Sequence, residues 1–128
     1  MSITLNHTIV PAHDKEKTAR FYTRIFGFEY IGAFASFIVI RINETLCFDF
    51  AVKEQFESHH YAFKVSDDEF DQIFVRIKAE GIVYGSSPYD PGNMEINHNY
   101  GGRGVYFRDE NGHLLEILTA DYEMNATS

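Results

Sequence analysis

The order of the predicted elements repeats along the chain, and this repeat restricts the fold more than any other feature of the sequence. A strand-like run, an amphipathic helix and three more strand-like runs fill the first half, and the same order returns in the second half. When the halves are aligned, His7 falls on His60 and Asp49 falls on Glu116. Since such internal repeats are typical of duplicated architectures, the sequence predicts an α+β fold built from two βαβββ modules.

Local signals place the elements within each module. Asp14 is a candidate N-cap for a helix over 15–28, which Gly27 ends, and a second helix is predicted over 67–81. The residue ranges predicted as strands are 28–34, 36–42, 45–52, 59–65, 103–109 and 113–119. The run 5–14 starts as a strand and ends at a polar boundary, and the run 82–89 is predicted as a strand that leads into a loop. The predicted organisation is a single domain over 1–128, with module one at 1–53, module two at 57–120 and a fraying tail at 121–128.

A carboxylate interrupts the last apolar strand, "GHLLEILT" at 112–119. An isolated buried carboxylate is costly, so Glu116 is either on a solvent-exposed face, paired with another group, or bound to a metal ion. The repeat favours the metal, because His7 and Asp49 in one module correspond to His60 and Glu116 in the other. If the two sheets face each other, the four side chains converge.

The ligand types restrict the metal. Two histidines and one carboxylate suit non-haem Fe(II), and a second carboxylate also suits Ni, Co, Zn or Mn. The expected cofactor is therefore a divalent metal ion of this group.

Charge and composition exclude several classes of function. The formal net charge is −8, which argues against nucleic acid and anionic membrane surfaces as partners. The N-terminus lacks the pattern of a signal peptide, and no apolar run approaches the length of a membrane span. The single cysteine excludes an intrachain disulfide. These features lead us to expect a cytoplasmic protein.

Four segments together resemble the vicinal oxygen chelate superfamily, which includes glyoxalase I, extradiol dioxygenases and bleomycin-resistance proteins. The segments are "LNHTIV", "ARFYTRIFGFE", "HYAFKVSD" and "GGRGVYFRDENGHLLEIL". The resemblance implies a curved eight-stranded mixed sheet around a metal and ligand cavity. It implies His7, His60 and Glu116 as metal ligands. Asp49 matches the position of a longer acidic ligand in glyoxalase I, so Asp49 binds the metal directly, through water, or not at all.

The resemblance implies a small metal-dependent enzyme whose substrate chelates the metal through vicinal oxygens. Glyoxalase-like lyase or isomerase chemistry, with Glu116 or Asp49 moving a proton, is slightly preferred over an extradiol-type dioxygenase, because extradiol enzymes are usually longer. The alternative is a protein of the bleomycin-resistance type, which sequesters a small molecule without catalysis. A homodimer is expected, with each metal cavity formed within one chain or by modules exchanged between two chains.

Four residues are candidates for binding the substrate. His98 and Tyr100 lie in a long loop over 90–102, a length that is often functional in a compact domain. For His98, plain exposure to solvent is the alternative. Arg103 precedes a predicted strand, and a surface salt bridge is its alternative role. Tyr106 offers a hydroxyl to a substrate oxygen or packs in the core. His113, in the turn before the last strand, is expected to be exposed.

Overall fold

The computed structural model of the chain describes residues 2–122. The predicted fraying tail at 121–128 lies outside the described residues from position 123 onward. The chain divides into two compact units, Met1–Glu57 and Ser58–Ser128. The division falls inside the short polar segment where the two predicted modules join. No helix in the described range is long and apolar enough to cross a membrane.

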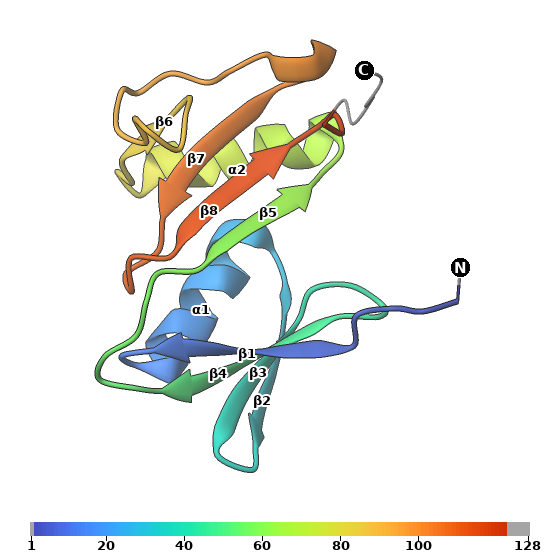
Figure 1. The fold of residues 1–128 in the computed structure, drawn as a ribbon, viewed down its shortest axis with the longest axis vertical. Helices are drawn as coiled ribbons and strands as arrows, with labels where there is room; N and C mark the ends of the chain where they lie inside the picture. The colour runs from blue at the N-terminus through green and yellow to red at the C-terminus, as the bar shows by residue number, and fades with distance from the viewer. Residues whose placement is uncertain (1, 123–128) are drawn as a thin grey trace. The chain divides into compact units, whose positions relative to one another are not determined.

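Unit 1 is a four-stranded mixed sheet with one helix against it (Figure 1). Its elements are β1 (His7–Ala12), α1 (Lys15–Phe26), β2 (Glu29–Phe34), β3 (Phe37–Arg41) and β4 (Cys47–Val52). The strand order is β1-β4-β3-β2, with β1 and β4 parallel and the other pairs antiparallel. A parallel pair needs a long crossover, and the chain supplies it with α1, β2 and β3.

Helix α1 has the boundaries that local chemistry predicts. The side chain of Asp14 accepts a hydrogen bond from the backbone N–H of Lys17 at 3.0 Å. Gly27 ends the helix with φ of 80°, a left-handed conformation that glycine adopts without steric cost. The helix buries one apolar stripe, and Tyr22 at its centre packs on Phe50 of β4 with ring centroids 5.2 Å apart.

Unit 2 repeats this arrangement. Its elements are β5 (His60–Lys64), α2 (Asp67–Ala79), β6 (Tyr84–Gly85), a 3-10 turn η1 (Asn99–Gly101), β7 (Gly104–Arg108) and β8 (Leu114–Leu118). The strand order is β5-β8-β7-β6, with β5 and β8 parallel. Ser66 and Glu69 form a capping box at the start of α2, in which each side chain accepts a hydrogen bond from the other residue's backbone N–H.

The pairing register repeats between the units. In unit 1, His7 lies opposite Cys47, two residues before Asp49. In unit 2, His60 lies opposite Leu114, two residues before Glu116. Each unit therefore places one histidine and one carboxylate at equivalent points of neighbouring parallel strands. The predicted pair of βαβββ modules is confirmed; their union in one eight-stranded sheet involves both units and stays a prediction.

The run 82–89, predicted as a strand that leads into a loop, contains the two-residue strand β6. Gly85 explains where the strand ends. A Cβ atom on Gly85 would lie 2.2 Å from the backbone oxygen of Asp90, because the loop folds back against the strand. The backbone N–H of Ser86 donates to the side-chain oxygen of Asn93 at 3.1 Å. This N–H is therefore not available for pairing with a neighbouring strand.

Candidate metal and ligand site

Glu116 lies at the centre of β8 and is 3% exposed. Its neighbours Leu115 and Ile117 are fully buried on the opposite face of the strand. Among the described residues, no donor makes a hydrogen bond to its Oε1 atom, although this atom is buried. The strand therefore holds an acceptor away from water without a hydrogen-bond partner, which is unfavourable unless a cation or a proton occupies the site.

His60 faces this oxygen from the neighbouring strand. Its Nε2 atom lies 3.3 Å from Glu116 Oε1, which is an ion-pair distance but lacks the alignment of a hydrogen bond. Its Nδ1 atom lies 3.0 Å from the backbone oxygen of Leu114. A carbonyl oxygen only accepts, so Nδ1 carries the proton. In the neutral ring, Nε2 then presents its lone pair towards Glu116.

Two electron-pair donors that face each other fit a metal ion. Ligand atoms at about 2.0–2.2 Å from one ion with tetrahedral geometry are about 3.3–3.6 Å apart, and the observed separation of Nε2 and Oε1 is 3.3 Å. A metal-binding histidine usually donates its second ring N–H to a carbonyl or carboxylate, as His60 does to Leu114. In the described part of the chain, no third His, Cys, Asp or Glu completes a group of three around a possible ion.

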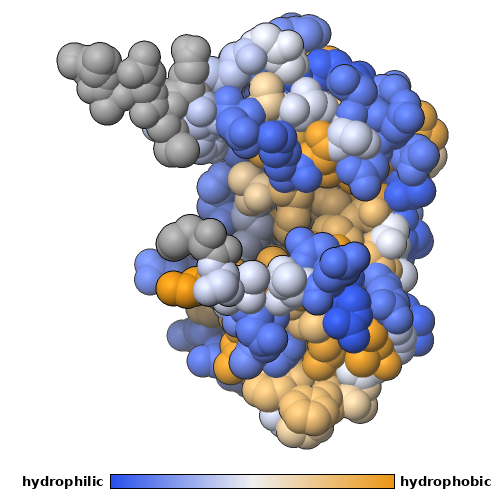
Figure 2. All heavy atoms as spheres, turned by 90° about the vertical axis from the view of Figure 1, so that its right-hand side faces the viewer, coloured by the Kyte–Doolittle hydropathy of each residue, from blue (hydrophilic) through white to orange (hydrophobic). Residues whose placement is uncertain are grey.

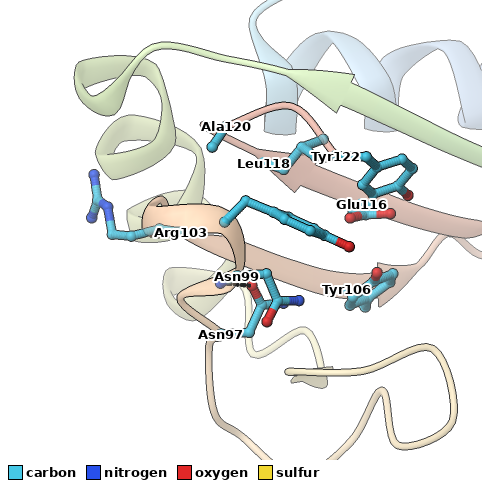
Figure 3. A pocket seen from close by; sticks show the side chains of 9 residues that line it. Asn97, Asn99, Arg103, Tyr106, Glu116, Leu118, Ala120 and Tyr122 are labelled. Atoms are coloured by element: carbon cyan, nitrogen blue, oxygen red, sulfur yellow. Dashed lines mark hydrogen bonds between the residues drawn. The ribbon is translucent and has the colours of Figure 1, made fainter. Parts of the chain in front are cut away.

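A small pocket of about 90 Å³ opens beside Glu116 within unit 2. The residues that line the pocket are Asn97, Asn99, Tyr100, Arg103, Tyr106, Glu116, Leu118, Ala120 and Tyr122. Figure 3 shows Tyr106 and Tyr122 on either side of the Glu116 carboxylate, each with its hydroxyl towards this region. The pocket therefore combines one carboxylate with phenol groups that can bind an oxygenated ligand.

Glu116 affects the ionisation of both tyrosines. Burial raises the pKa of Tyr106, and the charge of the nearby Glu116 carboxylate raises it further. For Tyr122, the charge of Glu116 is the largest cause of a raised pKa, followed by burial. Both phenols consequently stay protonated at neutral pH and are available as hydrogen-bond donors.

The structure brings only some of the predicted substrate-binding groups to this pocket. Tyr100 and Tyr106 line it, whereas His98 does not. Arg103 lines it in part, but its guanidinium points away from Glu116 in Figure 3. That group instead binds Asp71 at 2.8 Å and Asp67 at 3.1 Å on α2. Arg103 therefore makes the salt bridge that was its alternative role.

His7 and Asp49 lie in a groove of unit 1. The groove is lined by Asn6, His7, Ile31, Ala33, Phe34, Val39, Arg41, Cys47 and Asp49. His7 is exposed, and its Nδ1 donates to the side-chain oxygen of Asn6 at 2.6 Å, which leaves Nε2 as the lone-pair atom of the neutral ring. Asp49 is 8% exposed. Binding of one metal ion by His7 together with His60 and Glu116 stays a prediction.

Hydrophobic surface extends along the strands that border this groove. Ile31 and Phe34 of β2 are 43% and 68% exposed. Figure 2 shows orange surface at the end of the molecule where Figure 1 places the β2–β3 hairpin. The groove therefore offers apolar contacts beside the imidazole of His7 and the carboxylate of Asp49.

Sequence reasoning missed three residues around these sites. His113 is fully buried rather than exposed, because its ring accepts a backbone hydrogen bond. Tyr122 belongs to the segment predicted to fray, yet it lines the pocket and its ring contacts Tyr100 with centroids 5.7 Å apart. Asn97 fixes the loop through a hydrogen bond to the backbone oxygen of Ser86. An aromatic residue in a polar tail was the available signal for Tyr122.

Each of the two modules carries a histidine and a carboxylate on paired parallel strands. This arrangement defines a class of small α+β proteins with a ligand site on their sheets. The sequence profile of the Glyoxalase/Bleomycin resistance protein/Dioxygenase superfamily matches residues 4–117. The chain therefore belongs to this superfamily, as its resemblance to vicinal oxygen chelate proteins implied.

Solved structures of two proteins resemble the chain over almost its whole length. The structure named Oxidase ChaP-H2 is 48% identical, covers 96% of this chain and 98% of its own, and superposes with a TM-score of 0.92. Oxidase ChaP-H1 is 42% identical, covers 95% and 99%, and has a TM-score of 0.90. Metallothiol transferase FosB of Lysinibacillus sphaericus (strain C3-41) is 24% identical over 91% of this chain and 82% of that protein.

Proposed function

We propose that the protein is a metal-dependent oxidase that acts on a small substrate with neighbouring oxygen atoms and holds its metal with His7, His60 and Glu116. The observation that carries the proposal is the buried Oε1 atom of Glu116, which has no hydrogen bond among the described residues and lies 3.3 Å from His60 Nε2. The contribution of His7 rests on the repeated register and the family pattern. Similarity at 48% identity to a protein named as an oxidase favours oxidation over the lyase chemistry that the sequence slightly preferred.

The metal and the chain have separate tasks in this proposal. When bound, a redox-active divalent ion supplies Lewis-acid polarisation of substrate oxygens and electron transfer with dioxygen. Tyr106 lies opposite Glu116 on β7 and presents its phenol beside the carboxylate. Tyr100 and Tyr122 present phenols at the pocket, where they donate hydrogen bonds to the substrate. Asp49 is the proposed proton acceptor, because its carboxylate is 8% exposed and lines the same groove of unit 1 as His7.

The first test is the metal content of protein purified without an affinity tag, measured by elemental mass spectrometry. We expect about one divalent ion per chain, as for a single site of two histidines and a carboxylate. His60→Ala and Glu116→Gln should both abolish it. His98→Ala is the matched control, since His98 does not line the pocket and should leave the metal content unchanged.

The second test separates oxidation from other chemistry. Protein loaded with Fe(II) is mixed with catechols and α-hydroxyketones, which carry vicinal oxygens, and oxygen uptake is recorded. Uptake that requires both iron and one of these compounds supports the oxidase. Conversion of a compound without oxygen uptake identifies a lyase or isomerase. If wild-type protein retains no metal after incubation with Fe, Ni, Co, Zn or Mn, the metal-dependent proposal is wrong.

A further inference from the structure

The turn between β7 and β8 ends in a histidine whose side chain is fully buried. The backbone N–H of His113 donates to Asp109 Oδ1 at 2.9 Å, and the backbone N–H of Asp109 donates to the backbone oxygen of His113 at 3.1 Å. The turn thus fixes the position of the His113 ring. Because burial of an imidazole is unfavourable without compensating hydrogen bonds, the contacts of this ring indicate what it does.

The ring holds the backbone of His59, the residue that precedes His60. His113 Nδ1 accepts a hydrogen bond from the backbone N–H of His59 at 2.9 Å. An amide N–H only donates, so His113 Nδ1 carries no proton. On its other side, the backbone oxygen of His59 accepts from the backbone N–H of Leu114 at 2.9 Å. Residues 113 and 114 therefore bind both polar backbone groups of His59.

The same segment also binds the ring of His60. The backbone oxygen of Leu114 accepts the Nδ1 proton of His60 at 3.0 Å, and this contact determines which ring nitrogen faces Glu116. Two consecutive residues of the β7–β8 turn therefore hold two consecutive residues at the start of β5. A displacement of His59 would shift the Cα of His60, and the ring would then lose its alignment with both Leu114 and Glu116.

We propose that His113 is a positioning residue for the metal site: its Nδ1 atom anchors the backbone of His59 and thereby aims His60 Nε2 at Glu116 Oε1. This inference rests on the proposed function, because that proposal assigns His60 as a metal ligand. Substitution of a residue that orients a metal ligand without binding the metal commonly lowers metal affinity. A residue that merely fills space in the core would change the stability of the fold without changing the affinity of the folded protein.

Three variants distinguish a His113 that orients His60 from a His113 that only fills space in the core. His113→Phe keeps a planar ring of similar size but removes the acceptor. His113→Asn retains an oxygen at the position of Nδ1, whereas His113→Gln moves its acceptor to the distance of Nε2. His59→Phe is the matched control, because the His59 N–H donor belongs to the backbone and survives this change.

The affinity for Zn²⁺ is measured by competition with a chromophoric chelator, beside thermal unfolding of the metal-free protein. We expect His113→Phe and His113→Gln to bind Zn²⁺ about 10–100-fold more weakly, and His113→Asn and His59→Phe to stay within about threefold of wild type. Long-range ¹H–¹⁵N spectra of the metal-free protein should show a single His60 tautomer in wild type and His113→Asn, and exchange between tautomers in His113→Gln.

Two results are decisive against parts of this scheme. If His113→Gln unfolds at a lower temperature but binds Zn²⁺ as wild type does, the positioning role is overturned. His113→Gln keeps the test available if His113→Phe does not fold. Unchanged Zn²⁺ affinity in His60→Ala would instead overturn the assignment of His60 as a ligand, and with it the proposed function. The two failures are distinguishable because they occur in different variants.

Discussion

At the scale of single residues, one hydroxyl lies beside the Glu116 carboxylate. Tyr106 is 7% exposed and lies opposite Glu116 on β7, and Figure 3 shows its phenol oxygen turned towards the carboxylate. The ring of Tyr106 also lies nearly parallel to that of His60, with centroids 6.2 Å apart. Tyr106 therefore contacts both proposed ligands of unit 2 through different parts of its side chain.

We predict that Tyr106→Phe weakens metal binding while the fold is kept. The phenyl ring preserves the contact with His60, but the Glu116 carboxylate loses the phenol group beside it. Loss of such a donor should lower metal affinity by about tenfold. The measurement is chelator competition, with thermal unfolding as a check of the fold. Unchanged affinity in a folded variant would show that the hydroxyl does not orient the carboxylate.

A second tyrosine predicts how stability depends on alkaline pH. The Tyr61 hydroxyl lies 2.6 Å from His59 Nδ1. Burial and then the charge of Asp109 raise the pKa of Tyr61 to about 12. The unfolded chain releases this proton near pH 10, so between about pH 10 and 12 the folded state binds more protons than the unfolded state. Stability is therefore fully present below pH 10 and falls as pH rises through this interval.

Tyr61→Phe should remove the part of the stability loss at alkaline pH that comes from ionisation of Tyr61. Free energies of unfolding from urea denaturation, taken at several values between about pH 9 and 12, should decline less steeply in the variant than in wild type. Tyr89→Phe is the control, because Tyr89 is 96% exposed and gains little from the fold. Equal slopes for wild type and Tyr61→Phe would contradict the prediction.

The sequence predicted some residue pairs and not others for physical reasons. His60 and Glu116 were predicted to meet because strand alternation and the repeat both place them on one sheet face, and the structure puts them 3.3 Å apart. The burial of His113 could not be predicted in this way. It depends on a hydrogen bond from the backbone N–H of His59. Almost every residue type has such a backbone N–H, so the sequence does not show which one the His113 ring binds.

At the scale of elements, the loop before β7 and the first residue of β7 fix each other. The backbone groups of Asn97 and Gly104 exchange two hydrogen bonds, at 2.8 Å and 3.0 Å. The side chain of Asn97 lies so close that a Cβ on Gly104 would be 2.8 Å from its Oδ1 atom. Glycine at this position allows Asn97 to hold the segment that carries Tyr100 to the pocket.

We predict that Gly104→Ala loosens this loop. The added methyl group should displace the Asn97 amide and lower the free energy of unfolding by about 1–3 kcal/mol, the usual range for overpacking. Hydrogen exchange should quicken most within residues 86–102. Gly92→Ala is the control from the same loop, because its Cβ would meet only the flexible side chain of Val83, at 3.3 Å. Slow exchange retained throughout the loop in Gly104→Ala would contradict the prediction.

Helices and strands differed in how well the sequence predicted them. Helix α1 begins after Asp14 and ends at Gly27 as predicted, because capping depends on residues within one turn. Strand β6 shrank to Tyr84–Gly85 because a later loop folds back on it. That contact joins residues whose types do not specify the return path, so the sequence could not predict where within 82–89 the strand ends.

At the scale of the whole molecule, the repeat predicts that both units contribute to metal binding. His7 and His60 occupy equivalent registers, opposite Cys47 and Leu114. Neutral His7 and His60 each keep the Nε2 lone pair available, because the Nδ1 proton is donated to a side-chain or backbone oxygen. If both serve one ion, each is indispensable, although the Nε2 atom of His60 also lies 3.3 Å from the Glu116 carboxylate of its own unit.

We predict that His7→Ala loses metal as completely as His60→Ala, with His98→Ala as the unaffected control. Removal of one of three ligands leaves too few donors to hold a first-row ion against competing water. Elemental analysis of the dialysed proteins measures this directly. Full metal content in His7→Ala, beside loss in His60→Ala, would confine the ligands to unit 2.

The same two variants decide whether one chain supplies both histidines. His7→Ala and His60→Ala proteins are unfolded together, refolded as a mixture and assayed for bound metal. A site built within one chain remains defective in every molecule of the mixture. A site shared between chains regains an intact histidine pair whenever the two variants associate, because each then supplies what the other lacks. Metal in the mixture but in neither variant alone would show that the two histidines come from different chains, and a mixture without metal would show that one chain supplies both.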